Sequence, residues 1–411
     1  MKDLILMAAI PGFLLLMALE LWWDRRRGLG LYRLNDAFGS LTLGMMSRTT
    51  KLMLLSLGAL FMDRVLPEAR LMQWPAGSVW TWVFTFVAYD FLYYWYHRMG
   101  HTINILWAGH SIHHQSEDYN LSTALRQTST GIWDWVFYAP LLVLGVPVDV
   151  FLACAALNLI YQFWVHTQVV DKLGWMEWVM VTPSNHRVHH GQNPEYIDKN
   201  HGGVFIVWDR MFGSFQPELE GVEIIYGVSR PLRSLNPVRA NLQVWASLAA
   251  DAWHTRSWWD KLRIWFMPTG WRPADVVDAY PIASSDLQAF EKFDPPCDVK
   301  TRFYTLFQLA AGVPLLVYFM LHFDGLSYGM LLLGFAMVTL PLVTTSWMLE
   351  GRGRFWEWRR LLGCWVGFVL AWPTLASSSV AVFGIYLSFN SVLYLWLWGW
   401  QGASSQLSSS T

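Results

Sequence analysis

HRMGHTINILWAGHSIHH (97–114) and HRVHH (186–190) are the stretches that decide the fold, because they hold eight of the twelve histidines of the chain. The histidines form three groups with members three or four residues apart, a spacing that places each group on one face of a helix. Imidazole is the commonest metal-ligating side chain. Eight such donors are too many for one ion, so the sequence predicts two metals held by His97, His101, His110, His113, His114, His186, His189 and His190.

The kind of metal follows from the ligands that are present. The three cysteines, Cys154, Cys297 and Cys364, are widely separated, which excludes iron–sulfur clusters and cysteine-based zinc sites. The HExxH pattern of zinc proteases is missing, and adjacent histidines do not suit a bis-histidine haem. Imidazole suits zinc, copper, iron and nickel alike, and redox-active non-haem iron is the best match.

Composition places the chain in a membrane. Of 411 residues 54% are hydrophobic, 16% are aromatic and only 14% are charged, against roughly 25% charged in soluble domains. We therefore expect an all-α fold, a polytopic membrane helix bundle with a cytoplasmic histidine-rich site for two metals. The net charge of −1 gives no reason to expect nucleic acid as a partner.

The first spans set the orientation. Residues 4–23 are long enough to cross a ~30 Å hydrocarbon core, and the arginines at 25–27 and Arg33 place their carboxyl end in the cytoplasm. A second apolar run, 52–66, returns to the other side. A third, 79–96, comes back and ends directly on His97. This register predicts that the histidines lie at the cytoplasmic mouth of a membrane helix.

Residues 132–146 and 148–166 are a further apolar pair, interrupted around Gly145 and Pro147. A full hairpin and a shallow re-entrant pair both fit, and either returns the chain to the side that it left. His166 then lies level with the histidine groups. It is a candidate ligand, with an interfacial hydrogen-bonding histidine as the alternative.

Most of the charge falls between 167 and 302, which we expect on the cytoplasmic side. WHTRSWWDKLRIWFMP (253–268) fits a helix lying in the membrane interface, or a helix packed inside the domain. Three apolar runs follow at 303–322, 326–348 and 361–400, the last long enough for two spans, before a disordered tail. The expected parts are N-terminal spans (1–78), a di-iron catalytic domain (79–220), a cytoplasmic or interfacial helical region (221–302) and a C-terminal bundle with the tail (303–411).

Several polar residues near the histidines are candidates for orienting the ligands or for catalysis. Asp90 lies two helical turns before His97. Carboxylates and amides also follow the second and third groups, among them Asp198. For these carboxylates and amides, helix capping or a salt bridge with Arg126 or Arg187 is the alternative, and for Asp90 it is a hydrogen bond to a neighbouring helix. The candidates are Asp90, Glu117, Asn120 and His201.

The pattern HxxxH, HxxHH and a later HxxHH resembles the fatty acid hydroxylase and sterol desaturase superfamily of membrane di-iron oxygenases. WAGHSIHHQSEDYNLSTALRQTS (107–129) and NPEYIDKNHGGVFIVWDRMFGSF (193–215) resemble its alkylglycerol monooxygenase branch. The resemblance implies two iron ions on the eight histidines, with His166 an addition, and O2 as oxidant. It also implies a lipid substrate from the bilayer, hydroxylated at the carbon beside an ether oxygen, and tetrahydropterin as electron donor.

Two positions differ from the branch, which has a glutamate where this chain has Thr102 and a serine where it has Gln115. Other outcomes therefore stay open, namely a fatty acid or sterol hydroxylase or desaturase of the same superfamily, and a reductase as the electron donor. A non-redox zinc-binding transporter or structural protein is the alternative from another class. Histidines at the ends of spans, not at mid-membrane, favour an enzyme.

Overall fold

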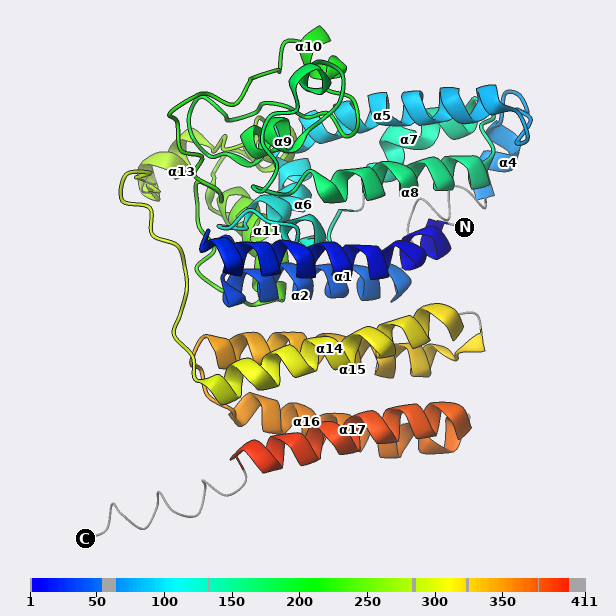
Figure 1. Cartoon of the computed structure of the whole chain (residues 1–411), viewed down its shortest axis with the longest axis vertical. Helices are drawn as coiled ribbons and strands as arrows, with labels where there is room; N and C mark the ends of the chain where they lie inside the picture. Colours follow the sequence, from blue (N-terminus) through cyan, green and yellow to red (C-terminus); the bar gives the residue numbers. More distant parts are fainter. Residues whose placement is uncertain are drawn as a thin grey trace. The chain divides into compact units, whose positions relative to one another are not determined.

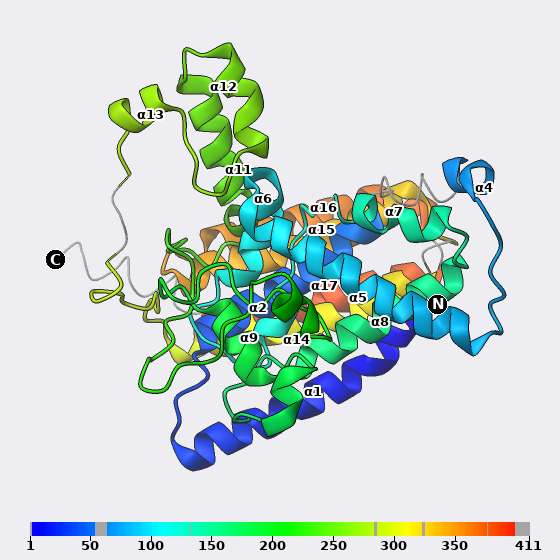
Figure 2. The ribbon, with the colours of Figure 1, turned by 90° about the horizontal axis from the view of Figure 1, so that it is seen from above.

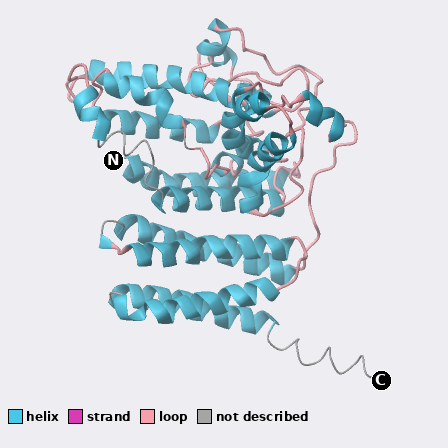
Figure 3. Cartoon of the chain, turned by 180° about the vertical axis from the view of Figure 1, so that it is seen from behind, coloured by secondary structure: helices cyan, strands magenta, loops and turns pink. Residues whose placement is uncertain are grey.

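The computed structural model describes residues 2–53, 64–131, 133–282, 286–322, 325–375 and 377–398. All regular structure in these ranges is helical, and the only β contacts are isolated bridges, so the all-α prediction is confirmed (Figure 3). The chain forms two compact units. Unit 1 comprises Met1–Ser40, Leu55–Arg233 and Arg239–Phe293, and unit 2 comprises Leu41–Leu54, Ser234–Val238 and Asp294–Thr411.

Unit 1 contains long apolar helices and several short ones (Figure 1). The predicted first and third spans are confirmed as helices, whereas the predicted span at 52–66 falls largely on 54–63, outside the described residues. A helix over 34–53 was not predicted, and α2 fills that stretch. The helices are α1 (Lys2–Arg27), the start of α2 (Leu34–Met53), α4 (Leu66–Ala69), α5 (Val79–Thr102), α6 (Asn104–His114), α7 (Asp134–Val143), α8 (Val148–Trp164), α9 (Pro183–His190), α10 (Val207–Met211), α11 (Pro237–His254), α12 (Trp258–Arg263) and α13 (Ala274–Ala279).

Helix α5 is the central element of unit 1 and packs against α6, α7 and α8, while α1 packs against α8. Aromatic rings fix the middle of α5. Tyr89 stacks on Tyr138 of α7 at 4.5 Å between ring centroids and contacts Phe151 of α8 at 5.6 Å. Such pairs add to the free energy of apolar burial and favour one relative rotation of the helices. The carboxyl-terminal end of α5, which carries the first histidines, is therefore held in a fixed direction.

The pair α7 and α8 decides between the two predicted arrangements. Helix α7 has ten residues and is about 15 Å long, half of the ~30 Å needed to cross. The turn after it is tight, since Gly145 has φ +103° and a Cβ there would lie 1.9 Å from the Met72 carbonyl oxygen. The tight turn suits both arrangements, and the short helix favours the re-entrant pair over the full hairpin.

Besides the larger part of α2, the described residues of unit 2 form four long helices, α14 (Val299–His322), α15 (Tyr328–Leu349), α16 (Phe355–Ala371) and α17 (Ser377–Trp398). They confirm the predicted apolar runs, including two helices within 361–400, although α16 begins six residues earlier than that run. Among the described residues, three helices are long and apolar enough to cross a membrane: Val299–His322, Tyr328–Leu349 and Ser379–Trp398.

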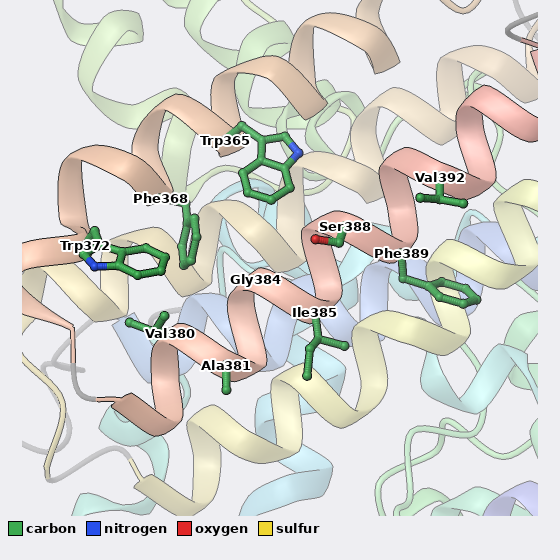
Figure 4. A pocket seen from close by; sticks show the side chains of 10 residues that line it. All are labelled: Trp365, Phe368, Trp372, Val380, Ala381, Gly384, Ile385, Ser388, Phe389 and Val392. Carbon is green, nitrogen blue, oxygen red and sulfur yellow. The ribbon is translucent and has the colours of Figure 1, made fainter.

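A buried ion pair and an apolar groove distinguish unit 2. The Arg360 guanidinium donates to both carboxylate oxygens of Glu357, at 2.6 and 2.9 Å, and the hydroxyl groups of Tyr304 and Thr344 donate to the same carboxylate. Between α16 and α17 lies a groove of about 640 Å³ (Figure 4), lined by Trp365, Phe368, Trp372, Val380, Ala381, Gly384, Ile385, Ser388, Phe389 and Val392. An apolar groove on a membrane helix fits lipid chains, so it does not identify a catalytic site.

The helical structure predicted for 253–268 is divided among three elements. Helix α11 ends at His254, and the Ser257 hydroxyl accepts a hydrogen bond from the Asp260 backbone N–H at 3.2 Å to start α12. A serine in this position satisfies one of the unpaired N–H groups at a helix start, which separates α12 from α11. A short 3₁₀ helix, Ile264–Phe266, continues the chain.

Candidate metal centre

Three helices of unit 1 bring the histidine groups together. Helix α5 carries the first pair near its carboxyl end, α6 carries the second group and α9 carries the third. Two residues favour the start of helix α9. The Thr182 hydroxyl accepts a hydrogen bond from the Asn185 N–H at 3.3 Å, and Pro183 occupies the first turn. The predicted helical setting of all three groups is confirmed.

The histidines divide into two sets, each with its ligand atoms within 4.8 Å of one another. We name them the five-histidine set, which comprises His97, His101, His110, His114 and His189, and the four-histidine set, which comprises His113, His166, His186 and His190. His166, from the turn after α8, completes the smaller set. Its predicted position level with the other histidines is confirmed.

The allocation follows helical geometry. Residues four apart lie on one helix face, whereas neighbouring residues point about 100° apart. Each pair four apart, such as His110 and His114, therefore enters one set, and the histidine between the members of that pair, His113, enters the other. Helix α9 repeats the arrangement, since His189 joins the five-histidine set while its neighbour His190 joins the smaller one. Each HxxHH motif thus contributes to both sets.

The ring nitrogens converge through Nε2. In the five-histidine set, Nε2 of His110 lies 2.9 Å from Nε2 of His97 and 3.2 Å from Nε2 of His114. In the four-histidine set, Nε2 of His166 lies 3.2 Å from Nε2 of His113 and 3.1 Å from Nε2 of His186. Two nitrogens bound at right angles to one ion at about 2.1 Å would lie about 3 Å apart. The spacing within each set fits one metal ion.

The opposite ring nitrogen of several histidines donates to a backbone carbonyl, which fixes the ring and leaves Nε2 as the lone-pair donor. The Nδ1 atoms of His97 and His189 pair with the carbonyls of His201 and Lys199 at 2.8 and 2.9 Å. Those of His113 and His166 pair with the carbonyls of Arg126 and Gln162 at 3.1 and 2.7 Å. These carbonyls belong to loops and a helix end, so the sequence could not reveal them.

Burial prepares the histidines to bind metal in the neutral form. It lowers the pKa of His113 to about 4, and it lowers the pKa of His110, His186 and His190 well below the usual value. The Nε2 atoms of His101, His189 and His190 are buried and have no hydrogen-bond partner. Unpartnered buried nitrogens are costly, and a metal ion would satisfy them. The residues therefore fit the metals that the histidine pattern predicts.

Asp90 contacts the loop that follows the last histidine group and, among the described contacts, bonds none of the histidine rings. Its buried carboxylate accepts from the backbone N–H groups of Val204 and Phe205 at 2.7 and 3.0 Å and from Nε1 of Trp208 at 2.9 Å. Asp209, which the sequence analysis missed, accepts from the N–H of His201 at 2.7 Å. The two carboxylates hold residues 201–209 in place.

The loop 201–209 contacts two members of the five-histidine set, His97 and His101. His201 offers its carbonyl to His97, and its ring lies 5.1 Å from that of His101 between centroids, so the structure brings this predicted residue to the site. Asp198 lies on the outer side, with Oδ1 3.6 Å from Nδ1 of His101. Both contacts fit a role in orienting the ligands.

The polar contacts of Glu117 and Asn120 hold the surrounding loops. Glu117 accepts from the Phe293 N–H and lies 3.7 Å from the Arg33 guanidinium, while Asn120 bonds Leu31 and Ser122. These contacts join loops, and they are neither helix caps nor salt bridges with Arg126 or Arg187. The arginines that the sequence offered as partners pair elsewhere, since Arg126 bonds Asp36 at 3.3 Å and Arg187 bonds Glu218 at 2.7 Å.

Two aromatic residues that the sequence analysis did not single out border the site. Trp107 lies 5.3 Å from the ring of His101, and Tyr119 lies 5.2 Å from the ring of His190, both between centroids. Both occur in the 107–129 stretch that carries the family resemblance. The family resemblance of that stretch was the one signal in the sequence that could have pointed to these two residues.

Comparison with known proteins agrees with this site. The fatty acid hydroxylase family model matches residues 82–214, which include all nine histidines of the two sets. The alkylglycerol monooxygenase of Homo sapiens is 35% identical over 93% of this chain and 88% of its own length. Those of Danio rerio and Xenopus tropicalis are 39% and 41% identical, over 73% and 64% of this chain and 67% and 59% of their own lengths. No solved structure gives a significant match.

The fold, the histidine centre and the matched family model define a metal-binding membrane enzyme, an oxidoreductase that hydroxylates lipids with O2. Within that class, the match to the human protein over most of both lengths shows that the chain belongs to the alkylglycerol monooxygenase family. The resemblance stated from the sequence is confirmed.

Proposed function

We propose that the chain is a di-iron monooxygenase that hydroxylates the ether-adjacent carbon of alkylglycerols. The single observation that supports it most is the division of nine histidines, seven of them buried and two half-buried, into two sets, each with the spacing of one metal site. The names of the relatives supply the substrate class. We assign His97, His101, His110, His114 and His189 to one iron, and His113, His166, His186 and His190 to the other.

Bound iron would supply the reduction of O2 and the oxidation of an unactivated C–H bond. One oxygen atom enters the C–H bond and the other leaves as water, with two electrons and two protons from the donor. The hydroxylated carbon is then a hemiacetal, which separates into an aldehyde and glycerol. Both sets have fewer than six histidine donors, so histidine would not fill every ligand position of either iron.

The chain's own residues would orient the ligands and exclude water. The carbonyls of His201, Lys199, Arg126 and Gln162 hold the rings, and burial keeps the imidazoles neutral. Tetrahydropterin is the proposed electron donor, as the resemblance implies. We place the site on the cytoplasmic face, on the strength of the arginines at 25–27 at the end of α1.

Thr102 and Gln115, where the chain differs from the branch, make local contacts. The Thr102 hydroxyl donates to the Arg98 carbonyl at 3.1 Å, and the Gln115 amide donates to the Ala240 carbonyl at 3.2 Å. Both positions adjoin histidines of the five-histidine set. We therefore include a reductase as the alternative donor in the test. Residues 79–220 remain our proposal for the catalytic domain, with 1–78, 221–302 and 303–411 as its supporting parts.

The test is iron content and product analysis on full-length protein in nanodiscs, reconstituted anaerobically. We expect about two irons per chain and release of aldehyde from an alkylglycerol when O2 and a tetrahydropterin are supplied. His113→Ala should abolish aldehyde release while leaving membrane insertion intact. His322→Ala is the matched control, because His322 lies in unit 2 and bonds only the Tyr318 carbonyl among the described contacts.

Each result decides a different part of the proposal. Stoichiometric zinc that iron cannot replace would contradict the di-iron assignment. Two irons with oxidation of fatty acids but not of alkylglycerols would contradict the substrate. Turnover with a reductase but not with the pterin would contradict the donor alone.

A further inference from the structure

Several large apolar side chains of one segment are exposed on the surface of unit 1. We name this set of residues the aromatic face, and it consists of Trp253, Trp258, Trp259, Leu262 and Phe266, whose side chains are 82%, 78%, 66%, 64% and 72% exposed. These residues end α11, fill α12 and continue into the 3₁₀ helix 264–266. Soluble proteins seldom expose so many large apolar side chains within one short segment, so their exposure indicates a contact partner.

The opposite side of the same segment is packed, so the exposure belongs to a folded element. Ile264 is fully buried against Ala108 of α6 and Leu248 of α11, and Trp265 and Trp271 pack around them. Figure 2 shows α12 and α13 at the edge of unit 1. The segment is thus amphipathic, with one side in the core of unit 1 and one side outside it.

Cations border the aromatic face. Lys261 lies 5.7 Å from the Trp258 ring and donates to the carbonyl oxygens of Ala252 and Trp253 at 2.8 and 3.0 Å, and Arg256 is exposed beside it. Tryptophan with a basic border is the composition of helices that lie in the headgroup region of a membrane. The cations complement lipid phosphates. Since the chain is an integral membrane protein, the surface of the bilayer always lies near it.

We propose that the aromatic face inserts into the interfacial layer of the bilayer and anchors α11–α12 beside the metal centre. The proposal rests on the membrane character of the chain and not on the proposed substrate. Its occupant is the lipid surface, not a protein.

The same segment is bonded to the junction that separates the first two histidine groups. The Asn104 N–H donates to the Met267 carbonyl at 3.0 Å, and the Asn104 side chain donates to the Ile264 carbonyl at 2.9 Å. The Thr269 N–H donates to the Thr102 carbonyl, next to His101, at 3.2 Å. A bilayer surface that covers the aromatic face would therefore adjoin the five-histidine set, where a lipid could leave the membrane for the site.

Nitroxide labels in the full-length protein test the proposal. Single cysteines are introduced by Trp258→Cys, Leu262→Cys and Phe266→Cys in a Cys297→Ser background, since Cys154 and Cys364 are buried. The protein is placed in vesicles of phosphatidylcholine with and without phosphatidylserine. Collision rates with O2 and with a water-soluble nickel chelate are measured. Leu340→Cys, exposed on α15, is the lipid reference, and Glu195→Cys, exposed in a loop, is the water reference.

We expect the ratio of oxygen to nickel collisions at the three labels to be several-fold above that at Glu195 and to approach that at Leu340. Adding phosphatidylserine should raise it further, because of the basic border. Values equal to those at Glu195 would overturn the proposal. Immobile labels protected from both reagents would also overturn it, because they would show a protein partner or a second copy. Iron content verifies the fold of each variant, and a variant that loses iron is replaced by Trp259→Cys.

Discussion

At the scale of the residue, the site depends on where each imidazole nitrogen points. Adjacent histidines such as His113 and His114 serve different sets, and backbone carbonyls determine which nitrogen remains for metal. Because Nε2 of His166 lies close to Nε2 of both His113 and His186, this residue is central to the four-histidine set. Its loss should therefore affect one metal more than the other.

We predict that His166→Ala lowers the iron content from about two to about one per chain, because the five-histidine set keeps all of its donors. His114→Ala should instead reduce both sites, since the His114 ring also packs on that of His190 at 4.4 Å. Elemental analysis with Mössbauer spectroscopy measures both effects. Two irons of unchanged spectrum in His166→Ala would exclude this residue as a ligand, and His322→Ala should match the parent protein.

At the scale of the element, helix ends and loops position what the helices carry. The loop 201–209 is fixed by two buried carboxylates, and its tight path requires glycine at Gly203. A Cβ there would lie 2.8 Å from Oδ1 of Asp90 and 2.8 Å from Cδ1 of Tyr93. The contact couples the loop to α5, which bears the first histidine pair.

We predict that Gly203→Ala shifts this loop and weakens metal binding at the five-histidine set, with a cost of about 1–3 kcal/mol in the free energy of unfolding. The measurement is the iron dissociation rate to a chelator, with denaturant unfolding for stability. Gly77→Ala is the control, because a Cβ at Gly77 meets nothing within 4 Å. Equal dissociation rates in the two variants would show that the loop does not support the ligands.

At the scale of the whole molecule, the two units differ in what stabilises them. Unit 1 holds the two histidine sets, whereas the described part of unit 2 holds no such set and has a buried Glu357–Arg360 pair among apolar helices. Metal should therefore contribute to the stability of unit 1 alone.

We predict that anaerobic chelation of iron raises amide hydrogen exchange in α6, α9 and residues 197–209 by at least about tenfold. Exchange in α14 and α15 should stay the same, which makes unit 2 the internal control. Hydrogen–deuterium exchange with mass spectrometry on the full chain in nanodiscs resolves these segments. A uniform rise across both units would mean that metal supports the protein globally, and no rise would mean that the histidine sets fold without it.

Local patterns in the sequence determined the helical class, the histidine groups, the C-terminal helices and the family. These features depend on residues within a few positions of one another, such as the spacing of His97 and His101 or an apolar run of twenty residues. Tertiary structure alone decided the division of the histidines between two sets, the carbonyls that orient them, the parts played by Asp90 and Asp209, and the exposure of the aromatic face. The first three features join residues that are distant in the chain, and the last depends on which side of a helix other elements cover. The spacing of residues along the sequence determines neither the distant contacts nor the covered side.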